Sequence, residues 1–88
     1  MKITLNKKNI VEYVEDHEYI LIDMLHNKFY TLDYIGSQIW NYLSRGFSLD
    51  HTVTQISNKF GVSVDQVKSD VIEFLEKLKS KGLVKIEN

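Results

Sequence analysis

The first third of the chain alternates between hydrophobic and polar positions, a pattern that predicts β-strands. Residues 10–14 and 19–24 are rich in β-branched and aromatic side chains, and a charged run separates them. Asn27, which tolerates a left-handed backbone, lies in a second turn before a third alternating run at 28–32. The pattern predicts three antiparallel strands joined by short turns.

After Asp33 the hydrophobic period lengthens to three or four residues, which predicts helices. Ser63 and Gln66 have the spacing of a capping box, and Gly36 is expected to let the sheet approach the first helix. Residues 83–86 are expected to form a short terminal strand or packed tail. The three predicted helices run from Asp33 to Arg45, from Ser48 to Gly61 and from Ser63 to Gly82.

Together these elements predict an α+β fold, a winged helix-turn-helix-like domain in which an N-terminal three-stranded antiparallel sheet precedes three helices. The length of 88 residues is that of a single domain, expected to span residues 1–88. Strands at the edge of such a small sheet carry unpaired N–H and C=O groups, which can pair with an extended peptide.

Composition excludes several classes of partner. The formal net charge of -1 provides no field that would attract nucleic acid or an anionic membrane. The chain has no cysteine, residues 1–8 are not followed by the apolar run of a signal peptide, and no stretch approaches a membrane span. We therefore expect a cytoplasmic protein that binds neither nucleic acid nor membrane.

No pattern of catalytic or cofactor-binding residues stands out. His17, His26 and His51 have no ligand partner at metal-site spacing, and the chain has no serine-nucleophile elbow, phosphate loop or dinucleotide fingerprint. We expect no enzyme activity, no metal and no cofactor. DNA binding by the third helix is an alternative, but Asp65 and Asp70 in its exposed half would face phosphates.

An ordered set of positions resembles the PqqD-like family of RiPP recognition elements, over roughly residues 10 to 86. The set comprises Phe29-Tyr-Thr-Leu-Asp33, Gly36, Ile39-Trp40, Leu43, Gly46-Phe-Ser48, Val67, Asp70-Val71, Phe74-Leu75, Leu78 and Gly82-Leu83. These small proteins bind the leader of a ribosomally made precursor peptide and hand it to modifying enzymes. The Ile39-Trp40 pair and the length are most similar to the stand-alone members of lasso-peptide pathways.

The resemblance implies a binding mode, in which the leader adds to the third strand, antiparallel to it, in a groove against the third helix. Lys28 or Lys68 would pair with leader acids, and Asp70 would accept a hydrogen bond. A proline at Tyr30 is expected to weaken binding more than it disturbs the helices. The expected peptide-binding residues are Lys28, Phe29, Tyr30, Thr31, Leu32, Val67, Lys68, Asp70, Val71, Ile72 and Leu75.

The function implied is that of an adaptor that presents a bound precursor peptide to a separate maturation enzyme, a lasso leader peptidase or cyclase in the first instance. Two alternatives remain: a winged-helix DNA-binding regulator, and a PqqD-type chaperone that serves a radical-enzyme pathway.

Overall fold

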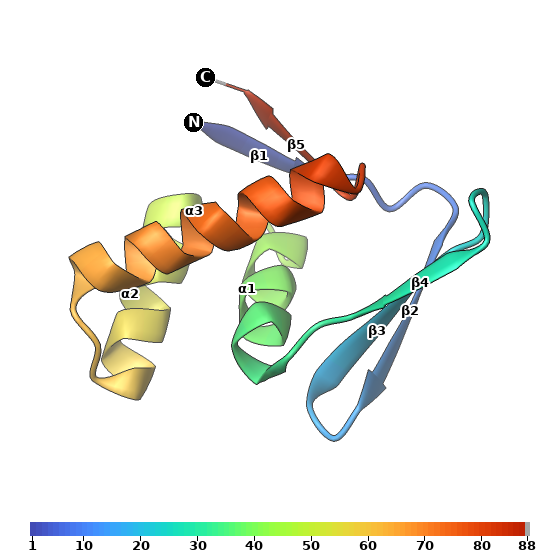
Figure 1. The fold of residues 1–88 in the computed structure, drawn as a ribbon. Helices are drawn as coiled ribbons and strands as arrows, with labels where there is room; N and C mark the ends of the chain where they lie inside the picture. The colour runs from blue at the N-terminus through green and yellow to red at the C-terminus, as the bar shows by residue number, and fades with distance from the viewer. Residues whose placement is uncertain (88) are drawn as a thin grey trace.

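The computed structural model describes residues 1–87 and places a three-helix block beside two antiparallel sheets (Figure 1). The α+β class and the three helices are as predicted. In chain order the elements are β1 (Lys2–Leu5), β2 (Ile10–Glu15), β3 (Glu18–Asp23), β4 (Lys28–Thr31), α1 (Tyr34–Ser44), α2 (Leu49–Phe60), α3 (Val64–Ser80) and β5 (Val84–Glu87).

The larger sheet has the order β2-β3-β4, so β3 is central and β4 is an edge strand. Its register opposes Ile20 to Thr31 and Leu21 to Tyr30. The predicted sheet is therefore confirmed, but it is not the whole of the β-structure. We predicted no strand at 2–5, and the structure pairs β1 with the terminal β5 in a second, two-stranded sheet.

Side-chain caps fix where the helices begin. Asp33, Ser48 and Ser63 each accept a hydrogen bond from the backbone N–H three residues later, and Gly61 ends α2 in the left-handed conformation. The capping box at Ser63 is only half formed. The side chain of Gln66 donates to Asp70 at 3.0 Å, and the hydrogen bond between Ser63 Oγ and the Gln66 N–H is the half that forms.

The core lies where the helices meet β3 and the chain entering β5. Trp40 of α1 is fully buried among these elements, and its indole N–H donates to Glu12 of β2 at 2.7 Å. Other buried side chains come from every layer, namely Leu21, Leu32, Ile39, Val53, Ile56, Val67, Val71, Leu75, Leu78, Leu83 and Val84. Within residues 1–87, no helix has both the length and the apolar character that crossing a membrane requires.

Ser37 connects the larger sheet to the helices. The Tyr19 N–H donates to the buried Ser37 hydroxyl at 2.8 Å, and this hydroxyl donates to the Leu32 carbonyl at 3.2 Å. Ser37 thereby bridges the Tyr19 N–H of β3 and the Leu32 carbonyl at the end of β4. These hydrogen bonds fix the position of β4 relative to α1.

Candidate functional site

The free edge of β4 presents unpaired backbone groups. The Leu32 N–H donates to the Tyr19 carbonyl at 2.9 Å, so Leu32 is a residue whose N–H and C=O point toward β3. Hydrogen-bonding direction alternates along an antiparallel strand. Tyr30 therefore also pairs with β3, and the N–H and C=O groups of Phe29 and Thr31 point away from the sheet. These two residues form what we call the open edge.

Helix α3 crosses α1 and runs toward the side of the molecule that carries β4 (Figure 1). A hollow lies at the end of β4, with a residue of α3 in its lining. The hollow has a volume of about 390 Å³ and is lined by Glu18, Thr31, Leu32, Asp33 and Phe74. Phe74 is the α3 side chain among them, and it is half-buried against the core. An extended chain lying in the hollow would contact the open edge on one side and an aromatic ring on the other.

Gly36 determines how closely the Phe74 ring approaches α1. A Cβ atom at this position would lie 2.8 Å from Phe74 Cε1, which is shorter than side chains tolerate. The close approach that we expected Gly36 to permit is therefore to α3, and the expectation that it accommodates the sheet is wrong. The absence of a side chain at Gly36 gives the hollow its aromatic wall.

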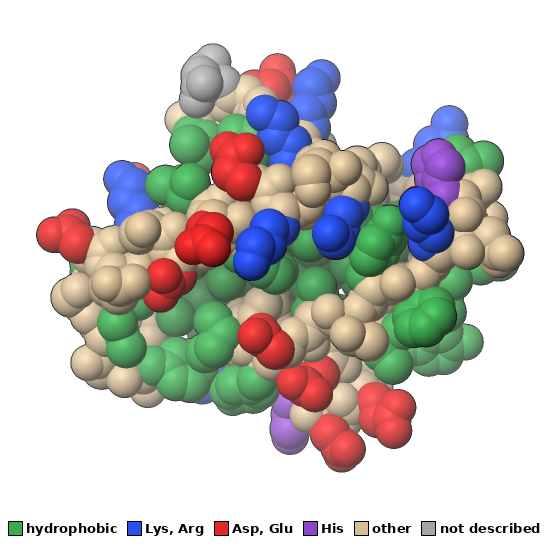
Figure 2. Space-filling model, viewed as in Figure 1, with side chains coloured by type: hydrophobic (Ala, Val, Ile, Leu, Met, Phe, Trp, Pro, Cys, Tyr) green, Lys and Arg blue, Asp and Glu red, His purple; other side chains and the backbone are tan. Residues whose placement is uncertain are grey.

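A second hollow lies at the other end of β4, near the end of α3. It has a volume of about 340 Å³ and is lined by Asp23, His26, Lys28, Tyr30, Ser80 and Lys81. Lys81 reaches toward the strand, with Nζ 5.8 Å from the centre of the Tyr30 ring. Acidic and basic side chains both lie along the α3 surface that faces the viewer in Figure 2, with the basic ones toward the end of the helix. We call the path between the two hollows, along β4 and α3, the β4–α3 groove.

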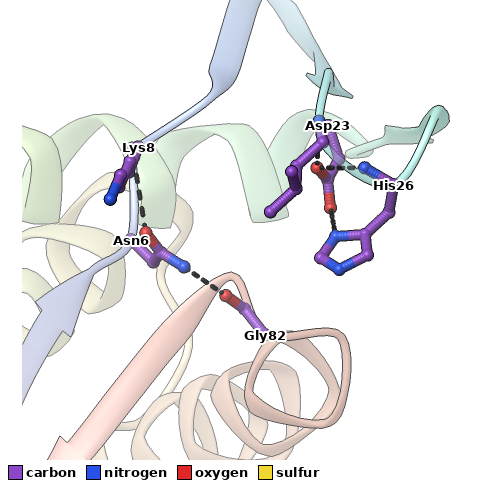
Figure 3. Close-up of polar contacts among 6 residues, drawn as sticks. Asn6, Lys8, Asp23, His26 and Gly82 are labelled. Atoms are coloured by element: carbon purple, nitrogen blue, oxygen red, sulfur yellow. Dashed lines mark hydrogen bonds and ion pairs between the residues drawn. The ribbon is translucent and has the colours of Figure 1, made fainter.

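A hydrogen-bonded turn holds the start of β4. Asp23 Oδ1 accepts from the Leu25 and His26 N–H groups at 3.1 Å each, and Oδ2 lies 2.7 Å from His26 Nδ1 (Figure 3). This turn and the Asn6–Gly82 hydrogen bond of 3.0 Å line a common hollow at the end of α3. Asp23 and His26 also line the hollow at the start of β4, together with Lys28.

The Asp23 carboxylate should make the turn sensitive to acid. The hydrogen bond with the His26 side chain, followed by that with the His26 N–H, lowers the pKa of Asp23 from its usual 3.8. A lowered carboxyl pKa stabilises the fold above the unfolded pKa, and this stability is lost as pH falls through the folded pKa. Between about pH 5 and pH 3 the melting temperature should therefore fall more for the wild type than for Asp23→Asn. If the melting temperatures of the two proteins fall equally with pH, Asp23 does not have this role.

The structure brings together some of the predicted site residues. Lys28, Tyr30, Thr31 and Leu32 line the two hollows. The Phe29 side chain is 72% exposed, on the sheet face opposite to Tyr30, where it lines a shallow hollow with Ile20 and Ile22. Phe29 therefore offers the groove its backbone groups, while its side chain lies outside.

The predicted residues of α3 are distributed differently. Val67, Val71 and Leu75 are buried in the core, while Lys68 and Asp70 are exposed. Ile72 is half-buried and lies about 160° around the helix from Phe74, so the two side chains leave opposite flanks of α3. The α3 side chains that line the hollows beside β4 are Phe74 and Ser80, followed by Lys81 at the helix end.

Sequence reasoning did not select Phe74 or Lys81 for the site. One signal was available, because Phe74 and Leu75 are adjacent and two adjacent side chains cannot both point to the centre of the helix's buried face. The more peripheral of such a pair lies at the boundary of the core. Which of the two boundaries faces β4 depends on the packing of α3 against the sheet.

Comparison with known proteins gives one family and two solved structures. The family model described as coenzyme PQQ synthesis protein D (PqqD) matches residues 18–84. The structure of TbiB1 in complex with the TbiA(beta) leader peptide is 28% identical, with a TM-score of 0.87 over 100% of this chain and 99% of that chain. No curated protein matches the chain.

The second solved structure is that of lasso peptide synthetase B1 complexed with the leader peptide. It is 17% identical, with a TM-score of 0.87 over 98% of this chain and 100% of that chain. At this identity the likeness concerns the fold alone. The region that the family model matches begins at β3 and includes the open edge and α3.

Proposed function

The chain belongs to the PqqD family, and we propose on that basis that it binds the leader segment of a ribosomally made precursor peptide in the β4–α3 groove. The observation that carries the proposal is the open edge of Phe29 and Thr31, which faces α3 across a hollow. A 28% identical chain of the same fold was solved with a leader peptide. The leader would extend the sheet as a strand antiparallel to β4.

The energetics of strand addition require side-chain anchors as well. Phe29 and Thr31 each offer one N–H and one C=O, and a hydrogen bond contributes about 0.5–1.5 kcal/mol net. Ordering a flexible peptide costs about 2–5 kcal/mol, which offsets most of that gain. An apolar leader side chain buried against Phe74 would contribute about 1.5–3 kcal/mol. Burial in the hollow at Phe74 would therefore supply most of the net binding free energy.

We propose an adaptor role without catalysis, in which residues 1–88 act as one domain in the cytoplasm. The bound leader would be presented to a separate maturation enzyme, such as a lasso leader peptidase or cyclase. The pathway rests on the resemblance of the Ile39-Trp40 pair to leader-binding proteins of lasso-peptide pathways. Service to a radical-enzyme pathway is the alternative within the same family.

The helices also support a winged helix-turn-helix-like interpretation of the fold. A three-residue turn, Gly61–Ser63, joins α2 to α3, and a short turn containing glycine is typical of that motif. The corresponding alternative function is DNA binding through α3. The exposed carboxylates of Asp65 and Asp70 oppose it, because a DNA reader must neutralise phosphates.

Fluorescence anisotropy can test both functions in one experiment. A labelled leader peptide, encoded by a precursor gene beside this one, is titrated with the protein, and a labelled random DNA duplex is titrated in parallel. Saturable peptide binding that survives moderate salt, without DNA binding, supports the proposal. Salt-sensitive DNA binding without peptide binding would replace it with the winged-helix regulator.

The variant Gly36→Ala should weaken leader binding with little effect on stability. Alanine favours the helix by about 1 kcal/mol over glycine, but its Cβ must displace the Phe74 ring. The half-buried ring lines the hollow beside β4, so we expect it to shift into this hollow, where the leader anchor would lie. We expect the free energy of unfolding to change by less than about 1 kcal/mol and the anisotropy titration to show weaker binding. An unchanged affinity would show that Phe74 does not contribute to leader binding.

A further inference from the structure

The two ends of the β4–α3 groove carry opposite charge. Glu18 and Asp33 line the hollow beside Thr31, and Lys28 and Lys81 line the hollow at the start of β4. Within residues 1–87 none of these four side chains forms an ion pair. Asp23, the carboxylate at the basic end, is already engaged by His26 and two backbone N–H groups.

The direction of β4 determines the order in which an antiparallel peptide would meet these charges. The strand runs from Lys28, at the basic end, to Thr31, at the acidic end. A peptide antiparallel to β4 therefore enters at Glu18 and Asp33 and leaves at Lys28 and Lys81. From Lys28 to Asp33 the strand path covers five residue steps, about 17 Å at about 3.4 Å per residue.

We propose that the groove selects leader peptides by charge order, with a cationic residue first and an anionic residue about five positions later. This inference rests on the proposed function and adds a property of the peptide that the groove accepts. The cation would meet Glu18 and the free oxygen of Asp33, whose other oxygen caps α1 at 2.7 Å from the Gly36 N–H. The anion would meet Lys28 and Lys81.

Lys81 also acts on Tyr30. With its Nζ 5.8 Å from the ring centre, the side chain extends from the end of α3 toward β4. A leader carboxylate at this position would hold the ammonium group over the bound strand. A leader cation there would repel it, so the wrong charge order is disfavoured at both ends.

The test uses two versions of the leader peptide encoded beside this gene, with lysine and glutamate at the two proposed positions or with the two residues exchanged. Both are titrated against the wild type and against the double variant Glu18→Lys/Lys81→Glu. Asp33 is left unchanged because it caps α1. The control double variant Glu76→Lys/Lys79→Glu makes the same charge changes on exposed residues of the other flank of α3.

The wild type and the control should prefer the lysine-first peptide by about 2- to 5-fold for each charge pair, and the Glu18→Lys/Lys81→Glu variant should prefer the exchanged peptide. Raising the salt should reduce both preferences, since these pairs are exposed. Equal binding of the two peptides, or the same preference in both double variants, overturns the charge-order inference alone. If neither these peptides nor the native leader binds, the proposed function itself fails.

Discussion

Replacing Thr31 with proline should abolish most leader binding while the domain stays folded. The Thr31 N–H points to the open edge and away from β3, so its loss removes no hydrogen bond of the sheet. Proline is tolerated in edge strands at such positions. Its ring occupies the space where the leader backbone would pair. We expect affinity to fall at least about 30-fold, a loss of about 2 kcal/mol, in the anisotropy titration.

Tyr30→Pro provides the contrast, and the structure changes what we expect of it. The Tyr30 N–H points toward Leu21 of β3, so proline there breaks the sheet and leaves an acceptor unpaired. We expect about 2–4 kcal/mol of lost stability in urea denaturation, with binding lost as a consequence. If Thr31→Pro keeps full affinity for the leader while it stays folded, the open edge is not the site where the leader docks.

Local chemistry made most of the fold predictable. Ser48, Ser63 and Gly61 are caps whose effect depends on a few neighbouring residues, so both ends of α2 and the start of α3 follow from sequence alone. Strand β1 was not predictable in this way. Its partner β5 lies some 80 residues away, and a four-residue strand is stabilised only by that pairing.

The candidate site likewise has features that local sequence predicts and features that it does not. Alternation correctly separates the exposed Phe29 and Thr31 from Tyr30 and Leu32, which pack on the core. Alternation does not give the phase of the hydrogen bonds, because either set of residues can face β3 in the ladder. The rotation of α3 was likewise undetermined, so Ile72 was selected where the structure has Phe74. The hydrogen-bonding phase of β4 and the rotation of α3 are both set by tertiary packing.

The largest expected loss of stability is that of Trp40→Ala. Trp40 is 0% exposed, and truncating a buried tryptophan costs about 3–5 kcal/mol. A domain of 88 residues has a free energy of unfolding of about 4–13 kcal/mol, so the variant should lose between about a quarter and all of its stability. Urea denaturation followed by far-UV circular dichroism measures the loss. A change below about 1.5 kcal/mol would show that the helix block can close around the missing ring.

Trp40→Phe separates packing from the hydrogen bond to Glu12. Most of the aromatic volume remains, and Glu12 keeps its 3.3 Å contact with Lys7, so the expected loss is only about 1–2 kcal/mol. Because Trp40 lies outside the β4–α3 groove, the folded fraction of Trp40→Ala should still bind leader. A saturating leader at about 100 times its dissociation constant should then restore about 2.7 kcal/mol of apparent stability. The same leader concentration should restore at most about 0.9 kcal/mol to folded Thr31→Pro, because its affinity is expected to be at least about 30-fold lower.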